Sequence, residues 1–323
     1  MINAAILGLG WWGQALVRAV QGRSQRIRFV KAVVPDMDKR ASAGAELNLV
    51  LTSSYEEVLA DASIRAVVIA TPHSMHVEQV MAAARAGKHV MCEKPLSLTG
   101  DGASNCVAAC DEAGVVLAVG HNRRFMPAFA VMRRLLHNGE LGSPLHIEAH
   151  SSNENARTHF SRWRSQRAES PAAGMTGTGV HLLDLLVSLL GRPSHVYAKI
   201  TAAAVNPPED TCNVLLTFAN GVSTTLSMVQ TTPRYWRMHL FGSAASIEIV
   251  NDHEVNLYRA GAPAARQTVD SADLLHLELE AFARAVDGEA EYPVSPDEMV
   301  WTAATLEAVC RSLESGKVER IAP

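Results

Sequence analysis

The chain has 323 residues, 48% of them hydrophobic and 19% charged, with a formal net charge of −4 at pH 7. This composition is typical of a globular protein of two domains, and it lacks the dense Lys/Arg runs of a protein that binds nucleic acid or an anionic membrane. We therefore expect a small-molecule partner and, with no apolar run of about 18 residues and no leader before the first strand, a cytoplasmic location.

In the first 121 residues, short apolar runs alternate with amphipathic stretches. This alternation is typical of βαβ units, which form a parallel sheet with helices on both faces. The sequence thus predicts an α/β protein whose residues 1–121 form a doubly wound Rossmann domain that binds NAD or NADP. The expected strands are 4–7, 29–34, 66–70, 89–92 and 115–119, and the expected helices include 14–20, 75–86 and 99–113.

Beyond residue 121 the pattern changes to successive strands with tight turns. Such a series predicts a large, mostly antiparallel open sheet, so residues 122–323 are expected to form an α/β domain for substrate binding and oligomerisation. A polar, Arg-rich stretch at 153–171 is expected to be a long loop. The expected strands are 145–151, 196–203, 213–218, 223–230, 236–241, 246–250 and 254–259, and the expected helices are 127–137, 178–190, 274–286 and 296–313.

The cysteines and histidines do not indicate a metal site. The five cysteines are an odd number without C-x-x-C spacing, which favours neither disulfides nor a thiolate zinc site. The pairs His73/His76 and His146/His150 lack a convincing third ligand. We therefore expect no metal.

A glycine-rich turn follows the first predicted strand. Gly8, Gly10 and Gly13, with Trp11 and Trp12 between them, form a G-x-G-x-x-G motif that opens a predicted helix. Such glycines allow a tight turn and close approach to a pyrophosphate, while the helix N-terminus presents N–H groups to the anion. The motif in this context predicts a dinucleotide site.

The end of the second predicted strand leaves the choice of cofactor open. An acidic residue usually binds the adenosine ribose here, but Pro35 occupies that position and Asp36 follows it. If Asp36 turns inward, NAD is favoured; if it points away, Lys39 or Arg40 could accept the 2′-phosphate of NADP.

Two polar clusters follow buried strands, and ligands of open α/β sheets bind at that edge. One contains Thr71, Pro72 and His76, and the other contains Glu93 and Lys94. We expect these residues to border the cofactor. A lysine whose pKa is lowered by desolvation and by an oxidised nicotinamide could exchange the proton of a reacting hydroxyl.

A glycine-rich segment leads into the helix predicted at 178–190. His181 and Asp184 are three residues apart on one face of that helix. The imidazole could exchange a proton with the reacting hydroxyl, and Asp184 could orient it or bond a nearby backbone group.

Together these motifs, in this order and spacing, resemble the glucose–fructose oxidoreductase / inositol dehydrogenase / rhizopine catabolism (Gfo/Idh/MocA) family over the full length of the chain. The most specific element is the Glu93-Lys94-Pro95 turn. The others are Gly8-x-Gly10-x-x-Gly13, Thr71-Pro72-x-x-x-His76, the stretch 120–125 and Gly179-x-His181-x-x-Asp184.

The resemblance implies an NAD(P)-dependent oxidoreductase of a sugar, inositol or related cyclic alcohol. It implies Lys94 beside the nicotinamide, often with a cis bond before Pro95, and His181 as the acid/base. It further implies that the C-terminal sheet forms the interface of a homodimer or homotetramer. Residues that resemble substrate-pocket positions are Asn122, Arg123, Arg124, Trp163 and Arg164, which suggest a polyhydroxy or anionic ligand.

One departure from the family pattern concerns the residue four before the histidine. Many sugar-active members have an aspartate there, whereas this chain has Gly177. Asp184, Thr178 or a substrate carboxylate could compensate. The alternatives are a cyclic diol or hemiacetal dehydrogenase of aromatic catabolism, a non-catalytic NAD(P)-binding sensor, or a hydrolase that uses NAD transiently.

Overall fold

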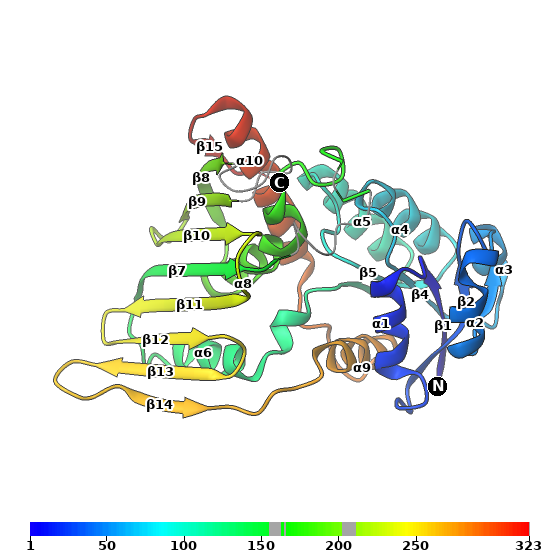
Figure 1. Ribbon diagram of the computed structural model, residues 1–323, viewed down its shortest axis with the longest axis horizontal. Coiled ribbons are helices and arrows are strands. Elements are labelled where there is room, and N and C mark those ends of the chain that lie inside the picture. The colour runs from blue at the N-terminus through cyan, green and yellow to red at the C-terminus, as the bar shows by residue number, and fades with distance from the viewer. Residues whose placement is uncertain (155–162, 165, 202–210, 323) are drawn as a thin grey trace. The chain divides into compact units, whose positions relative to one another are not determined.

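A computed structural model describes residues 1–154, 163–164, 166–201 and 211–322. Two compact units, each described here by itself, make up the chain (Figure 1). Unit 1 contains Met1–Ser97, Asp101–Asn122 and Asp273–Met299, and unit 2 contains Leu98–Gly100, Arg123–Ala272 and Val300–Pro323.

Unit 1 is built on a parallel sheet of six strands in the order β3-β2-β1-β4-β5-β6. This is the Rossmann order, and it confirms the predicted fold class. The central strands are almost wholly buried because helices cover both faces of such a sheet. The strands are β1 (Ile2–Leu7), β2 (Ile27–Val33), β3 (Val50–Thr52), β4 (Ala66–Ile69), β5 (His89–Cys92) and β6 (Leu117–Val119).

The helices of unit 1 include one that the sequence placed in the second domain. Helix α9 (Leu274–Val286) packs beside α1 (Trp11–Val20) and β2 (Figure 1). Ion pairs of Arg26 with Glu280 (3.6 Å) and Glu289 (2.6 Å) add to this contact. The remaining helices are α2 (Ala41–Glu46), α3 (Tyr55–Ala60), α4 (His76–Arg85) and α5 (Gly100–Glu112), with short turns η1 (Asp38–Arg40) and η2 (His73–Met75).

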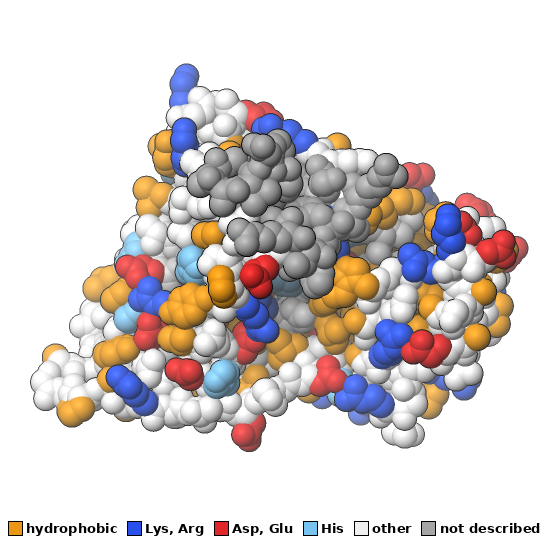
Figure 2. Space-filling model, in the orientation of Figure 1, with side chains coloured by type: hydrophobic (Ala, Val, Ile, Leu, Met, Phe, Trp, Pro, Cys, Tyr) orange, Lys and Arg blue, Asp and Glu red, His pale blue; other side chains and the backbone are white. Residues whose placement is uncertain are grey.

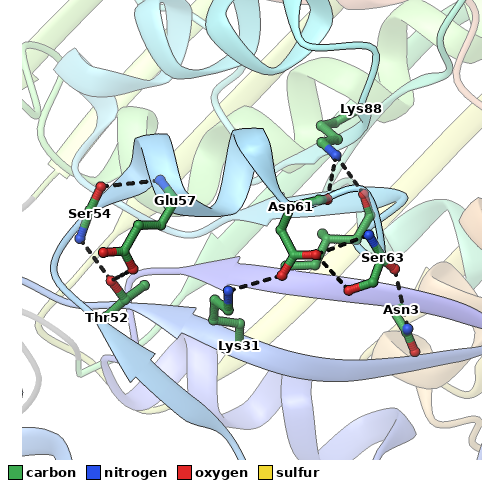
Figure 3. A network of polar contacts seen from close by, with 9 residues as sticks. Asn3, Lys31, Thr52, Ser54, Glu57, Asp61, Ser63 and Lys88 are labelled. Carbon is green, nitrogen blue, oxygen red and sulfur yellow. Dashed lines mark hydrogen bonds and ion pairs between the residues drawn. The ribbon is translucent and has the colours of Figure 1, made fainter.

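A network of polar contacts ties α3 to the strands beside it (Figure 3). The Lys88 ammonium donates to the carbonyl oxygens of Asp61 and Ile64, both at 2.8 Å. The Asp61 carboxylate accepts from Lys31 on β2 (3.0 Å) and from Ser63 (2.6 Å). These bonds pair polar groups of the segment that follows α3 and so fix the path of the backbone from α3 into β4.

Unit 2 is built on a sheet of nine strands in the order β14-β13-β12-β11-β7-β10-β9-β8-β15. Only β7 and β10 pair in parallel; the other pairs are antiparallel, as predicted. The strands are β7 (Pro144–Ser152), β8 (Pro193–Thr201), β9 (Thr211–Phe218), β10 (Ser223–Val229), β11 (Tyr235–Gly242), β12 (Ala245–Val250), β13 (Glu254–Arg259), β14 (Ala265–Thr268) and β15 (Glu319–Arg320).

Side chains alternate between a buried and a more exposed face along the strands of unit 2. The buried face carries Trp236, Met238 and Leu240 of β11. Figure 2 shows hydrophobic, histidine and charged side chains intermingled over the strands on the other face. The helices of this unit are α6 (Pro127–His137), α8 (Val180–Leu190) and α10 (Pro296–Ser315), with η3 (Asn122–Phe125) and the π-helical turn η4 (Met175–Gly179).

Three further expectations concern the whole chain. The loop expected at 153–171 lies partly outside the described residues, as does the end of the strand expected at 196–203. All five cysteines are free. No helix of the described part is long and apolar enough to cross a membrane.

Candidate functional site

Each glycine of the turn between β1 and α1 has a different environment. Gly8 has φ +90°, and a Cβ there would lie 2.6 Å from the Ala70 carbonyl oxygen. A Cβ on Gly13 would lie 2.0 Å from the Gly8 carbonyl oxygen, so this glycine lets the helix approach the strand. A Cβ added to Gly10, by contrast, would meet no atom of the described residues within 4 Å. The space beside Gly10 is therefore open to a ligand.

Helix α1 begins directly after this opening. Gly10 is its N-cap residue, and no side chain caps the helix end. An uncapped helix N-terminus carries partial positive charge and attracts phosphate. Trp11 is 57% exposed, and its ring contacts that of Trp12 edge to face. The turn thus fits the pyrophosphate of a dinucleotide, in agreement with the sequence prediction.

The acidic residue after β2 is held by a neighbouring cation. The Asp36 carboxylate forms an ion pair with the Lys39 ammonium at 2.6 Å and accepts from the Lys39 backbone N–H at 3.2 Å. These bonds to Lys39 lower the pKa of Asp36. Arg40 follows in η1 and is exposed. The three groups that could choose between a ribose hydroxyl and a 2′-phosphate therefore lie at the surface, and two of them, Asp36 and Lys39, are paired with each other.

His76 connects the two polar clusters that follow β4 and β5. Its Nδ1 lies 2.8 Å from the Pro95 carbonyl oxygen and its Nε2 lies 3.1 Å from the Thr71 carbonyl oxygen. The side chain is fully buried, and that it borders the cofactor stays a prediction. Thr71 itself donates its hydroxyl hydrogen to Gln79 at 2.6 Å. Each ring nitrogen of His76 thus lies within hydrogen-bond distance of a backbone carbonyl oxygen.

Lys94 lies just after β5, in the turn that His76 contacts, and the Lys94–Pro95 peptide is cis, as expected. The preceding Glu93 is buried, and its carboxylate accepts from the Lys94 backbone N–H at 3.3 Å. A Cβ on Gly120 would lie 2.9 Å from that carboxylate. The Glu93 side chain thus occupies the space that Gly120 leaves at the end of β6. Whether Glu93 also contacts the cofactor stays a prediction.

In unit 2, Arg124 and Asp184 form a buried ion pair. The guanidinium donates from Nε to Oδ2 at 2.7 Å and from Nη2 to Oδ1 at 2.8 Å, with side chains 1% and 0% exposed. The sequence led us to expect Arg124 at the substrate and Asp184 either orienting His181 or bonding a nearby backbone group, and these site roles stay predictions. The ion pair itself joins η3 to α8, the helix that carries His181.

Arg123 lies in a different polar cluster, which the sequence did not reveal. Its guanidinium lies 5.4 Å from the ring centre of Trp236 and 3.5 Å from the Asp252 carboxylate, which also pairs with Arg234. Burial, together with the neighbouring Arg234 and against the attraction of Asp252, lowers the pKa of Arg123 to about 10. Within the part of the chain that the structure describes, the buried indole N–H of Trp236 has no hydrogen-bond partner. This cluster therefore has a donor that the described residues do not use.

The glycine-rich segment before His181 contains one glycine that packing does not require. A Cβ on Gly174 would lie 1.9 Å from the side-chain nitrogen of Gln230, and one on Gly179 would lie 2.3 Å from the sulfur of Met175. A Cβ on Gly177 would meet no atom of the described residues within 4 Å. The described residues therefore leave open space at the position where many members of the resembled family carry an aspartate. His181 is buried at the start of α8.

The remaining predicted site residues are only partly placed. Asn122 begins η3 next to Arg123. The Arg164 guanidinium lies 4.6 Å from the ring centre of Trp163, and undescribed residues flank this pair on both sides. Among the described residues, no group of three or more His, Cys, Asp or Glu could hold a metal ion.

Comparison with known proteins assigns both halves of the chain. The family described as "Oxidoreductase family, NAD-binding Rossmann fold" matches residues 2–121, and "GFO/IDH/MocA C-terminal domain" matches residues 129–248. The chain belongs to the Gfo/Idh/MocA family. It is accordingly a member of an oxidoreductase family with an NAD-binding Rossmann domain, as the sequence predicted.

Individual relatives cover nearly the whole chain. The 1,5-anhydro-D-fructose reductase of Ensifer adhaerens is 29% identical over 96% of this chain and 94% of its own length. The D-xylose 1-dehydrogenase (NADP⁺) 2 of Haloferax volcanii is 29% identical over 96% and 97%. A levoglucosan dehydrogenase solved with NADH and L-sorbose superimposes with a TM-score of 0.89 over 99% of each chain at 20% identity, a likeness of fold alone.

Proposed function

We propose that this enzyme transfers a hydride between NAD(P) and a hydroxyl- or carbonyl-bearing carbon of a sugar, an inositol or a related cyclic alcohol. The observation that carries this proposal is the position of Lys94, held in a turn at the carboxyl end of β5, in the unit that contains the glycine turn. The names of the two full-length relatives, an anhydro-sugar reductase and an aldose dehydrogenase, support this substrate class.

The chain's own residues supply binding and proton transfer. When bound, the nicotinamide supplies the hydride acceptor or donor. Lys94 takes the hydroxyl proton when the alcohol is oxidised and returns it when the carbonyl is reduced, for which desolvation of its ammonium group is favourable. We propose His181, buried at the start of α8 in unit 2, as a second group that exchanges a proton in the reaction.

The residues present fit a dinucleotide. Gly10 leaves open space at an uncapped helix N-terminus, and this is where the pyrophosphate is proposed to bind. Asp36 would bind the adenosine ribose after release from Lys39, whereas Lys39 and Arg40 would face a 2′-phosphate. The choice between NAD and NADP therefore depends on which member of this pair the cofactor engages.

Arg123 is the residue we propose for substrate binding in unit 2. It combines a mostly buried guanidinium with the unpaired indole N–H of Trp236 and the Asp252 carboxylate. Charged donors of this kind bind hydroxyl-rich or anionic groups. Asn122, Trp163 and Arg164 stay predictions for substrate binding.

The test is a turnover assay with NAD⁺ and NADP⁺ against aldoses, anhydro-sugars, inositols and cyclic diols, and with NADH and NADPH against the corresponding carbonyl compounds. We expect a change in reduced-nicotinamide absorbance with at least one compound. Gly10→Val is the matched control: its side chain meets no protein atom near the Cβ, so it should fold normally and lose cofactor binding. A wild-type protein that binds cofactor and turns over nothing in either direction would contradict the proposal.

A second candidate function is that of an NAD(P)-binding sensor without catalysis. The open space at Gly177, where a carboxylate is absent, favours it. In that case Lys94→Ala would leave the biological role intact, while Gly10→Val would abolish it.

Self-association through the open sheet of unit 2 is proposed as well. Exposed apolar side chains lie on its strands, among them Tyr197 (39%), Leu215 (46%) and Tyr235 (40%). Covering such side chains in a homodimer or homotetramer would remove apolar area from water. Light scattering should show a mass that falls to the monomer value in Leu215→Arg. The cytoplasmic location stays a prediction.

A further inference from the structure

One buried side chain joins the lysine turn to the neighbouring strand end. His76 is the first residue of α4, and it is 0% exposed. Its Nδ1 contacts the carbonyl of Pro95, the residue directly after Lys94, and its Nε2 contacts the carbonyl of Thr71, two residues after β4 ends. The imidazole therefore bridges two loops that follow adjacent strands of the sheet.

The chemistry of the two contacts fixes the direction of the bonds. A carbonyl oxygen only accepts, so each ring nitrogen that bonds to one must carry a hydrogen. The protonated ring donates to both carbonyls. A neutral ring with its hydrogen on Nδ1 keeps the shorter bond, 2.8 Å to Pro95, whereas one with its hydrogen on Nε2 donates only to Thr71. In the protonated ring and in the Nδ1–H tautomer, the N–H at Nδ1 restrains the backbone beside Lys94.

We propose that His76 is a positioning residue for Lys94: its Nδ1–H holds the Pro95 carbonyl and so fixes the backbone from which the lysine side chain extends. This inference rests on the role proposed for Lys94. A bond that sets the place of a reacting group affects the chemical step, since a displacement of about 1 Å can cost about a hundredfold in rate. The Pro95 contact does not involve the glycine turn that is proposed to hold the cofactor, whereas the Thr71 contact lies in the loop beside Gly8 of that turn.

Two substitutions of His76 by amide side chains test the Pro95 contact and the Thr71 contact one at a time. In His76→Asn the amide nitrogen reaches the place of Nδ1 and can donate to Pro95, whereas in His76→Gln it reaches the place of Nε2 and can donate only to Thr71. His76→Leu removes both donors. Tyr55→Phe is the matched control, because Tyr55 donates its hydroxyl hydrogen to the Gln79 carbonyl on the same helix, away from the lysine turn.

The experiment measures kcat, KM and the cofactor dissociation constant of these variants by steady-state kinetics and calorimetry. We expect kcat to fall by about 10- to 100-fold in His76→Gln and His76→Leu, and by less than about fivefold in His76→Asn. The cofactor dissociation constant should stay within about threefold in all of them, and Tyr55→Phe should keep the wild-type kcat. If His76→Leu does not fold, the difference in kcat between His76→Asn and His76→Gln is sufficient to test the proposal.

Two results would overturn the proposal: a kcat in His76→Gln equal to that of the wild type, or equal losses in His76→Asn and His76→Gln. Lys94→Met, measured in parallel, separates this failure from that of the proposed function. If Lys94→Met is inactive while His76→Gln is fully active, only the positioning role of His76 is wrong. If Lys94→Met turns over like the wild type, the role of Lys94 itself is wrong.

Discussion

The buried pair of Arg124 and Asp184 gives a prediction that can be worked from the structure. In Asp184→Leu the guanidinium, 1% exposed, loses the carboxylate that accepts two of its N–H groups. Removing one member of a buried pair leaves an uncompensated charge and costs about 3–5 kcal/mol. For a domain of this size, that loss lowers the melting temperature by roughly 6–20 °C.

Replacing both charges should restore most of the loss. In the double variant Arg124→Met/Asp184→Leu no buried charge remains, and apolar replacements of a buried pair are often close to neutral. We therefore expect the double variant to lose less free energy of unfolding than the two single variants lose together, by about 2 kcal/mol or more. The exposed pair Arg18–Glu46 is the matched control, and Glu46→Gln should cost less than about 1 kcal/mol.

The assay is denaturant unfolding of the wild type, the two single variants, the double variant and the control. The free energies of unfolding give the coupling between Arg124 and Asp184 directly. Single losses below about 1 kcal/mol, or a double variant that loses the full sum, would refute the coupling that we expect between the two residues.

Three further predictions follow from individual contacts. Gly13→Ala places a Cβ 2.0 Å from the Gly8 carbonyl, so the free energy of unfolding should drop by about 3 kcal/mol, measured by denaturant unfolding; an unchanged value would contradict the packing argument. Bonds from Ser63 and then Lys31 lower the pKa of Asp61 from 3.8 to about 2, so Asp61→Asn should be less stable than the wild type above pH 4. That difference should vanish as the pH falls through about 2, since the protonated aspartate no longer favours the folded state; melting curves against pH check it. Lys39→Ala should weaken NADP binding about two- to fivefold relative to NAD, and calorimetry showing the opposite order would contradict the placement of Lys39 at the 2′-phosphate.

The sequence was sufficient where a local rule decides the structure. The glycine turn and five of the six strands of the parallel sheet were predicted, because glycine spacing and apolar runs are local signals, and the family resemblance implied the cis Lys94–Pro95 bond. It was also sufficient for the class of protein. Short elements were missed, such as β3 and β14, because three or four residues carry too little periodicity to read.

Contacts between distant residues were out of reach of the sequence. Nothing local pairs Arg124 with Asp184, sixty positions apart, or brings the ring of Trp236 to Arg123. Likewise, α9 returns to unit 1 through contacts with α1 that its own helical pattern does not reveal. The strand end beside His76 could be predicted from the sequence, whereas the contact of its ring with the Pro95 carbonyl could not.

The role of Lys94 is the central claim, and one measurement tests it most directly. It is the rate of nicotinamide reduction or oxidation at saturating cofactor and saturating concentration of the best substrate, compared between the wild type and Lys94→Met. The account predicts a rate lower by about 10²- to 10⁴-fold, with the cofactor dissociation constant within about threefold, because general acid–base catalysis is lost while the glycine turn is intact. A Lys94→Met variant that keeps a third or more of the wild-type rate would contradict it.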